Sequence, residues 1–188
     1  MNGMRDEETG LGDGELMDAL AGGRETALGE LMGRWGGRVT AFLERMSGRR
    51  QLAEELAHET FVRIYQSRGK WRRGGRFQPW VFSIAANLVR QRLRWERRHP
   101  AAEDGGEGLV VEDPGADPAE LAERAERAAA VREAVLGLPE ELREAVVLTV
   151  YEGLTQVEAA EAAGTTVKGM ERRVSRAREL LRRRLEGA

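Results

Sequence analysis

Cationic and small polar residues recur at helical spacing near the end of the chain, where they could bind nucleic acid. At 100° per residue, one face of a helix over 167–185 carries Lys168, Arg172, Ser175, Arg176 and Arg183. The opposite face carries the apolar residues Val167, Met170, Val174, Ala177, Leu181 and Leu185. Cationic side chains bind phosphates, and arginine also reads base edges. The alternative is an ordinary amphipathic helix whose charged face is solvated.

The residues before this helix have the signals of a helix-turn-helix. Thr155 and Glu158 form a capping box for a short first helix, and Gly164 is placed to end it, because glycine accepts the left-handed conformation. Thr166 can cap the second, basic helix. A basic helix presented by a tight turn is the arrangement that enters the DNA major groove. Because caps, spacing and charge agree, we favour DNA reading over the solvated amphipathic helix.

A second group of cations stands beside aromatic residues in the middle of the chain. Residues 70–76 combine Lys70 and three arginines with Trp71, and Phe77 and Trp80 follow. Such a mixture suits single-stranded nucleic acid, because charge follows the phosphates and rings hold unstacked bases. The alternative is a surface loop whose rings anchor the core, and we favour it for Phe77 and Trp80. For Trp71 and its arginines we favour nucleic-acid binding.

The elements expected to position these groups are all helical. In an N-terminal module over 13–98, apolar residues recur at helical spacing from Leu16 to Met46, again over 51–68, and in a helix from about Trp80 to Arg98. The alternation of apolar and polar residues that is typical of strands does not occur. The sequence therefore predicts an all-α fold.

The formal net charge of −2 conceals two basic modules around an acidic segment. Residues 63–98 are rich in arginine, residues 101–126 are rich in aspartate and glutamate, and the last helix is basic again. The acidic stretch also contains glycine and proline, which predicts a flexible linker over 99–126 between domains at 13–98 and 127–186. Its acidity has two open interpretations: a solvated spacer, or a polyanionic strand in a basic channel of a partner.

Composition excludes several classes of protein. The chain has 188 residues and no cysteine, which excludes disulfides and thiolate metal sites. No apolar stretch is long enough to span a membrane, and the acidic N-terminus is unlike a signal peptide, so we expect a cytoplasmic protein. His58 and Glu59 begin like a metalloprotease helix, but Val62 stands where the second histidine is needed. We expect no enzyme activity, no metal and no cofactor.

Three blocks, in this order, resemble the extracytoplasmic-function sigma factors, group 4 of the sigma-70 family. AEELAHETFVRIYQ, at 53–66, resembles the helix that docks on the clamp helices of the largest polymerase subunit. KWRRGGRFQPWVFSIAANLVRQRLRWERR, at 70–98, resembles the segment that melts and reads the −10-type element. LPEELREAVVLTVYEGLTQVEAAEAAGTTVKGMERRVSRARELL, at 138–181, resembles the domain that reads the −35-type element. The resemblance runs from about Glu15 to Leu185.

The resemblance implies a role for particular residues. Those facing the polymerase clamp are Glu55, His58 and Glu59. Those binding the −10-type element, with the loop as a pocket for a flipped base, are Trp71, Arg72, Arg73, Arg76, Asn87, Arg90, Arg94, Arg97 and Arg98. Those facing the −35-type element are Lys168, Glu171, Arg172, Ser175 and Arg176. Glu171 stands where the family commonly has a cation, which favours a contact to a cytosine amino group.

The resemblance also implies partners and a function. It predicts a promoter-specificity subunit that binds core RNA polymerase and promoter DNA, responds to stress or another signal, and is held by an anti-sigma factor. Two other classes remain: a regulator that binds duplex DNA without polymerase, and an adaptor that binds RNA without regard to promoters. The acidic clamp-like helix and the Trp71 loop, in one chain with a helix-turn-helix, favour the sigma factor.

Overall fold

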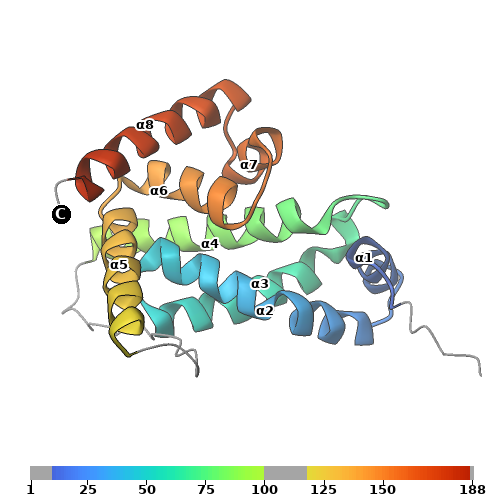
Figure 1. Cartoon of the computed structure of the whole chain (residues 1–188). Coiled ribbons are helices and arrows are strands. Elements are labelled where there is room, and N and C mark those ends of the chain that lie inside the picture. The colour runs from blue at the N-terminus through green and yellow to red at the C-terminus, as the bar shows by residue number, and fades with distance from the viewer. Residues whose placement is uncertain (1–9, 100–117, 187–188) are drawn as a thin grey trace, which may run out of the picture.

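Helices make up the regular structure of the part of the chain that the computed structural model describes, residues 10–99 and 118–186 (Figure 1). The first half contains α1 (Asp13–Ala21), α2 (Thr26–Ser47), α3 (Arg50–Ser67), a short 3₁₀ turn η1 (Arg68–Lys70) and α4 (Phe77–Arg98). The second half contains α5 (Pro118–Leu136), α6 (Glu140–Val146), a π-helical turn η2 (Val147–Tyr151), α7 (Gln156–Ala163) and α8 (Val167–Leu185). The predicted all-α fold is confirmed.

The N-terminal half is built around an aromatic core between α2 and α4. The ring centroids of Trp35 and Phe77 lie 5.4 Å apart in an edge-to-face arrangement, and those of Phe42 and Phe82 lie 5.1 Å apart. Aromatic pairs in such geometry stabilise a core beyond their buried area. The expectation that Phe77 belongs to the core is confirmed, because its exposed fraction is only 3%. This core gives α4 a fixed position, from which its charged side chains project.

The C-terminal half packs α6, η2, α7 and α8 around small and aliphatic side chains. Ala159 and Ala162 of α7 are buried against Met170 and Val174 of α8. Because alanine side chains are small, α7 and α8 can pack closely. Of the apolar stripe predicted for α8, the terminal residues Val167 and Leu185 are exposed, because the core ends before either tip of the helix is reached.

Helix α5 begins earlier than the sequence predicts. A linker was expected over 99–126, but the chain is helical from Pro118 onward. Proline is well suited to the first turn of a helix, where its missing N–H has no intrahelical partner to lose. The acidic stretch at 100–117 lies outside the described residues.

The two halves of the chain pack directly against each other, which the sequence did not predict. Figure 1 shows α6 and α7 lying over α4, with α8 on the outer side and α5 beside α2. Buried residues of both halves, among them Val89 of α4, Leu148 of η2 and Ala160 of α7, belong to one continuous apolar cluster. No helix in the described residues is long and apolar enough to cross a membrane.

Candidate nucleic-acid and polymerase interfaces

The helix-turn-helix predicted around Gly164 has the expected geometry. The Thr155 hydroxyl accepts a hydrogen bond from the Glu158 backbone N–H, while the Glu158 carboxylate accepts from the Thr155 backbone N–H at 2.9 Å. Gly164 ends α7 in the left-handed conformation, with φ 65°. The Thr166 hydroxyl caps α8 by accepting from the Gly169 backbone N–H at 3.0 Å. The angle between α7 and α8 is therefore set by local hydrogen bonds.

The residues predicted to face the −35-type element share the exposed face of α8. The structure leaves the side chains of all five open to solvent; they are Lys168, Glu171, Arg172, Ser175 and Arg176. Of this set, Arg176 also lies 3.6 Å from Glu179, one turn further along. A cationic face near the N-terminal end of an exposed second helix can enter a DNA groove without moving any other element.

The Lys70–Arg76 loop is anchored to the N-terminal helix. The Trp71 indole N–H donates to Asp18 Oδ1 at 2.7 Å, and the Trp71 ring stacks edge-to-face on Trp80, with centroids 5.3 Å apart. Gly14 of α1 also faces the loop, since a Cβ there would lie 3.3 Å from the carbonyl oxygen of Gly75. Trp71 thus anchors the loop, and its contact with nucleic acid stays a prediction. Arg72 and Arg73 extend into solvent.

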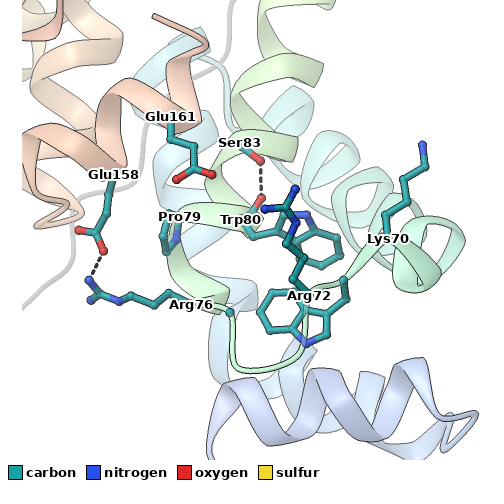
Figure 2. A pocket seen from close by; sticks show the side chains of 10 residues that line it. Lys70, Arg72, Arg76, Pro79, Trp80, Ser83, Glu158 and Glu161 are labelled. Carbon is teal, nitrogen blue, oxygen red and sulfur yellow. Dashed lines mark hydrogen bonds and ion pairs between the residues drawn. The ribbon is translucent and has the colours of Figure 1, made fainter. Parts of the chain in front are cut away.

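A pocket of about 630 Å³ lies between this loop and the start of α4 (Figure 2). Trp71, Trp80 and Pro79 give it apolar walls, and Arg72 and Arg76 bring cations to its rim. Rings beside cations are what an unstacked base and its phosphate require. The third side of the pocket comes from the other half of the chain, because Glu158 and Glu161 of α7 also line it. Neither carboxylate was predicted to lie beside this loop.

Helix α4 carries the remaining residues predicted to bind the −10-type element. Asn87, Arg94, Arg97 and Arg98 are exposed, and Arg90 is partly buried. One side of a second cavity, of about 750 Å³, is lined by Asn87, Arg90, Arg94 and Arg97. Its opposite side is formed by α6, α7 and α8, including Glu140 and Glu144. The structure therefore brings the predicted residues together but closes the second half of the chain over them.

Three of these predicted arginines form ion pairs with glutamates of the C-terminal half. Arg76 pairs with Glu158, Arg90 Nη1 lies 3.1 Å from Glu144, and Arg97 pairs with Glu140. Arg90 also donates to the carbonyl oxygen of Ala163 at 2.8 Å.

The pKa values of the glutamates at this contact are shifted in different directions. Burial raises the pKa of Glu144 to about 7, although Arg90 and Arg173 oppose the shift. Burial also raises the pKa of Glu152, against the attraction of Arg38 and Arg45. For Glu158, burial alone would raise the pKa, but hydrogen bonds from Thr155 and Arg76 outweigh it and hold the pKa below its usual value.

Glu152 occupies the centre of a second cationic group that the sequence did not reveal. Its carboxylate lies 3.3 Å from Arg38 and 3.8 Å from Arg45, both on α2, and its side chain is 3% exposed. The Gln78 amide donates to the backbone oxygen of Glu152 at 2.6 Å. The sequence contains one signal for such a contact. Glu144 and Glu152 flank the mostly apolar run 145–151, and a glutamate beside a buried apolar run is unusual unless it has a charged partner.

The residues predicted to face the polymerase clamp lie along one side of α3. Glu55 and His58 are exposed, and Glu59 is partly exposed and pairs with Arg63 one turn later at 2.8 Å. Leu56 and Phe61 turn into the core and fix the helix. An acidic helix face that is open to solvent can meet a basic partner. Within the described residues, no cluster of histidine and acidic side chains has the geometry to hold a metal.

Comparison with known proteins identifies the chain. Residues 31–99 match the family described as Sigma-70 region 2, and residues 128–181 match Sigma-70, region 4. RNA polymerase sigma factor CarQ of Myxococcus xanthus is 32% identical over 166 residues, which cover 88% of this chain and 93% of CarQ. ECF RNA polymerase sigma factor EcfG of Rhodopseudomonas palustris is 30% identical over 143 residues, 76% of each chain.

Solved structures agree with the sequence relatives. CnrH, in complex with the cytosolic domain of CnrY, is similar with a TM-score of 0.71 and 26% identity, over 93% of this chain and 97% of CnrH. The similarity extends over both halves of the chain, so the helical arrangement described above is shared with CnrH. The chain therefore belongs to the extracytoplasmic-function sigma factors of the sigma-70 family, the promoter-specificity subunits of bacterial RNA polymerase.

Proposed function

We propose that this protein directs core RNA polymerase to a dedicated set of promoters through three separate surfaces. The acidic side of α3, with Glu55, His58 and Glu59, binds the clamp helices of the polymerase. The Lys70–Arg76 loop and α4 open and bind the −10-type element. The exposed face of α8 reads the −35-type element. In this assignment residues 13–98 form the first functional domain and 127–186 the second, joined by the acidic linker.

The observation that carries this proposal is the presentation of α8. Its apolar residues Met170, Val174 and Ala177 are buried, while the five residues assigned to duplex DNA are all exposed. Capping hydrogen bonds at Thr155 and Thr166 fix the turn before it. The capped turn that presents this basic face, together with the match of residues 128–181 to Sigma-70, region 4, favours groove reading over a helix that is merely solvated.

The proposal also covers the regulatory partner of the protein and its location in the cell. CnrH was solved with the cytosolic domain of CnrY, and the sigma factor RpoE of Bartonella quintana with the anti-sigma factor NepR. We infer by analogy that an anti-sigma factor holds this protein until a stress or another signal releases it. The protein acts in the cytoplasm and has no catalytic activity of its own, because bond formation belongs to the polymerase.

Run-off transcription with purified core polymerase on a promoter library tests the proposal directly. Transcripts from a subset of promoters, absent with core alone, are the expected result. A triple variant in which Lys168, Arg172 and Arg176 become alanine tests whether α8 recognises the promoters, and it should give no transcripts from that subset. If the wild-type protein shifts duplex DNA alone but gives no transcript with core, it is a stand-alone regulator. Promoter-independent RNA binding would identify an RNA adaptor instead.

A further inference from the structure

The C-terminal end of α4 carries two stacked rings at its surface. The exposed fraction of Trp95 is 48%, whereas that of Trp35 in the core is 6%. The His99 imidazole lies nearly parallel to the Trp95 indole, with ring centroids 4.9 Å apart and an interplanar angle of 21°. His99 Nδ1 donates to the Trp95 carbonyl oxygen at 3.0 Å, because a carbonyl oxygen can only accept. The end of the helix therefore holds both rings in one orientation.

A groove of about 490 Å³, called here the Trp95 groove, lies between these rings and α3. Leu56 of α3 and Leu88 of α4 line it together with Trp95. All of its lining residues belong to α3 or α4, so the C-terminal half takes no part in it. It is also separate from the pocket beside Trp80. Trp80 and Trp95 are 15 positions apart on α4, which places them about 22 Å apart along the helix axis.

Two cations of the Trp95 groove have no counter-charge. The other two arginines that line it are already paired; the pairs are Arg63–Glu59 and Arg92–Glu96. Within residues 10–99 and 118–186, Arg94 and Arg98 form no ion pair. Arg98 donates from Nε to the Arg94 carbonyl oxygen at 3.3 Å, which leaves its two Nη groups for a partner. The groove therefore offers positive charge directly beside an exposed aromatic ring.

This combination favours nucleic acid over a protein segment. Every base has a flat face that can stack on aromatic rings, while arginines bind the phosphates. An acidic protein segment would use the cations but not the stacked rings. Core polymerase is the competing occupant, because Glu59, which the proposed function assigns to the clamp, also lines the groove. The basic partner that suits Glu59 would be repelled by Arg94 and Arg98.

We propose that the Trp95 groove is a second binding site for single-stranded DNA. One unpaired base extends the Trp95–His99 stack, and Arg94 and Arg98 bind the phosphates beside it. The inference rests on the proposed function, in which α4 binds the opened strand. It adds a role for Trp95 and His99, which that function leaves without one, and it places the strand at both ends of α4.

A pair of substitutions at Trp95 separates stacking from apolar contact. Leucine keeps an apolar side chain but removes the ring, while phenylalanine keeps a ring. Fluorescence anisotropy of a labelled single-stranded DNA of mixed sequence, with the full chain and without polymerase, measures affinity at several salt concentrations. Trp95→Leu should weaken binding by about five- to hundredfold, the usual effect of losing one base stack, and Trp95→Phe should retain most of the affinity.

The salt dependence distinguishes the rings from the arginines. Trp95→Leu should leave the slope of affinity against salt unchanged, because an indole makes no ionic contact with a phosphate. Arg98→Ala should lower that slope, whereas Arg24→Ala, in the exposed segment between α1 and α2, is the charge-matched control and should not. Equal affinities of Trp95→Leu and Trp95→Phe, or no binding by the wild type, would overturn the proposal.

A second variant protects the test against misfolding. If Trp95→Leu loses helical circular dichroism, His99→Ala replaces it, because His99 is exposed and follows the last residue of α4. It removes the outer ring of the stack and should weaken binding about fivefold, at the lower end of the range for one stack. Unchanged affinity in this variant would also overturn the proposal.

A photo-crosslink identifies the occupant in the working complex. With p-benzoylphenylalanine in place of Trp95, irradiation of the holoenzyme on labelled promoter DNA should join position 95 to a DNA strand. A crosslink only to a polymerase subunit, or only to the transcript, overturns the assignment to DNA. Run-off transcription by the wild type separates the two proposals. Its failure overturns the proposed function, while the anisotropy of the Trp95 variants still decides whether the groove binds a strand.

Discussion

The Arg90 guanidinium and the Glu144 carboxylate lie 3.1 Å apart and join α4 to α6, with the Glu144 side chain only 2% exposed. Despite this partner, the pKa of Glu144 rises to about 7, because burial disfavours the charged carboxylate more than Arg90 and Arg173 favour it. A buried ion pair of this kind adds little to stability, since desolvation offsets most of the attraction. The Arg90–Glu144 pair therefore matters mainly for which residues of α4 and α6 contact each other and for how that contact depends on pH.

Stability should therefore fall as pH rises toward neutrality. Between about pH 4.5, the ordinary pKa of a glutamate, and about pH 7, the folded protein keeps a proton on Glu144 that the unfolded chain has released. The free energy of unfolding decreases across this window, by up to about 3 kcal/mol from Glu144. Glu152, whose pKa burial also raises, acts in the same direction. Urea unfolding at several pH values measures the slope.

Glu144→Gln is the control for this pH dependence. Glutamine is neutral at every pH, so the free energy of unfolding of this variant should depend less on pH. Above about pH 7 it should exceed that of the wild type. Two other glutamates have lowered pKa values in the folded protein: Glu158, described above, and Glu96 of α4, where hydrogen bonds from Arg49 and Arg92 outweigh the effect of burial. They stabilise the folded protein above the ordinary pKa of a glutamate and lose that effect below about pH 4.5, outside the window. Equal slopes for wild type and Glu144→Gln would show that Glu144 does not titrate there.

Polymerase docking should depend on the acidic side of α3. Changing Glu55 and Glu59 to lysine should abolish binding to core polymerase, because both carboxylates face solvent and a basic partner would then be repelled. Helical content should stay the same. The control reverses Glu123 and Glu126 on α5, which alters the net charge equally. Co-purification of the α3 variant with core at the wild-type level would exclude this face.

Duplex recognition should depend on Arg172 and Arg176. Alanine at either position should cost about 1–3 kcal/mol of promoter binding if the arginine contacts a base edge, and should relax preference at one position. A phosphate contact weakens all sequences alike and lowers the salt dependence. Arg182→Ala, at the exposed far end of α8, is the comparison and should have a smaller effect. Band shifts of the holoenzyme on promoter variants measure both properties.

Promoter opening should depend on the tip of the Lys70–Arg76 loop. Serine at Arg72 and Arg73 should spare the closed complex but block strand separation, because capture of a flipped base must offset a few kcal/mol of lost stacking and pairing. Both side chains are exposed, so the change leaves the Trp71 anchor and the Arg76–Glu158 pair in place.

Permanganate footprinting of thymines near the start site follows this opening step. A pre-melted template should partly rescue transcription by the serine variant, because its strands are already unpaired. Full thymine reactivity on ordinary duplex DNA would assign opening to other residues.

The local elements could be predicted from the sequence because their signals are local. The capping box at Thr155, the left-handed Gly164 and the cap at Thr166 each involve residues within four positions of one another. The exposed face of α8 follows from helical periodicity alone. The start of α5 at Pro118 was missed, because the acidic and glycine-rich composition around it resembles a linker more than a helix.

The contact between the halves could not be predicted, because its partners are distant in sequence. Arg38 and Glu152 are separated by 114 positions, and Arg90 and Glu144 by 54. Periodicity shows that Arg90 is off the apolar side of α4, but not that a carboxylate meets it. The anchoring of Trp71 was missed for the same reason, since its hydrogen-bond partner Asp18 is 53 positions away.

Through the hydrogen bond from Trp71 to Asp18, α1 supports the loop that we propose to open promoters. Helix α1 carries none of the residues assigned to polymerase or DNA, yet Asp18 accepts a hydrogen bond from Trp71 of the loop and Gly14 lies close to Gly75. A genetic screen for alleles that assemble with polymerase but stall before the first phosphodiester bond is expected to return Asp18→Ala. Such alleles would map far from the promoter-binding helices while disabling the same step.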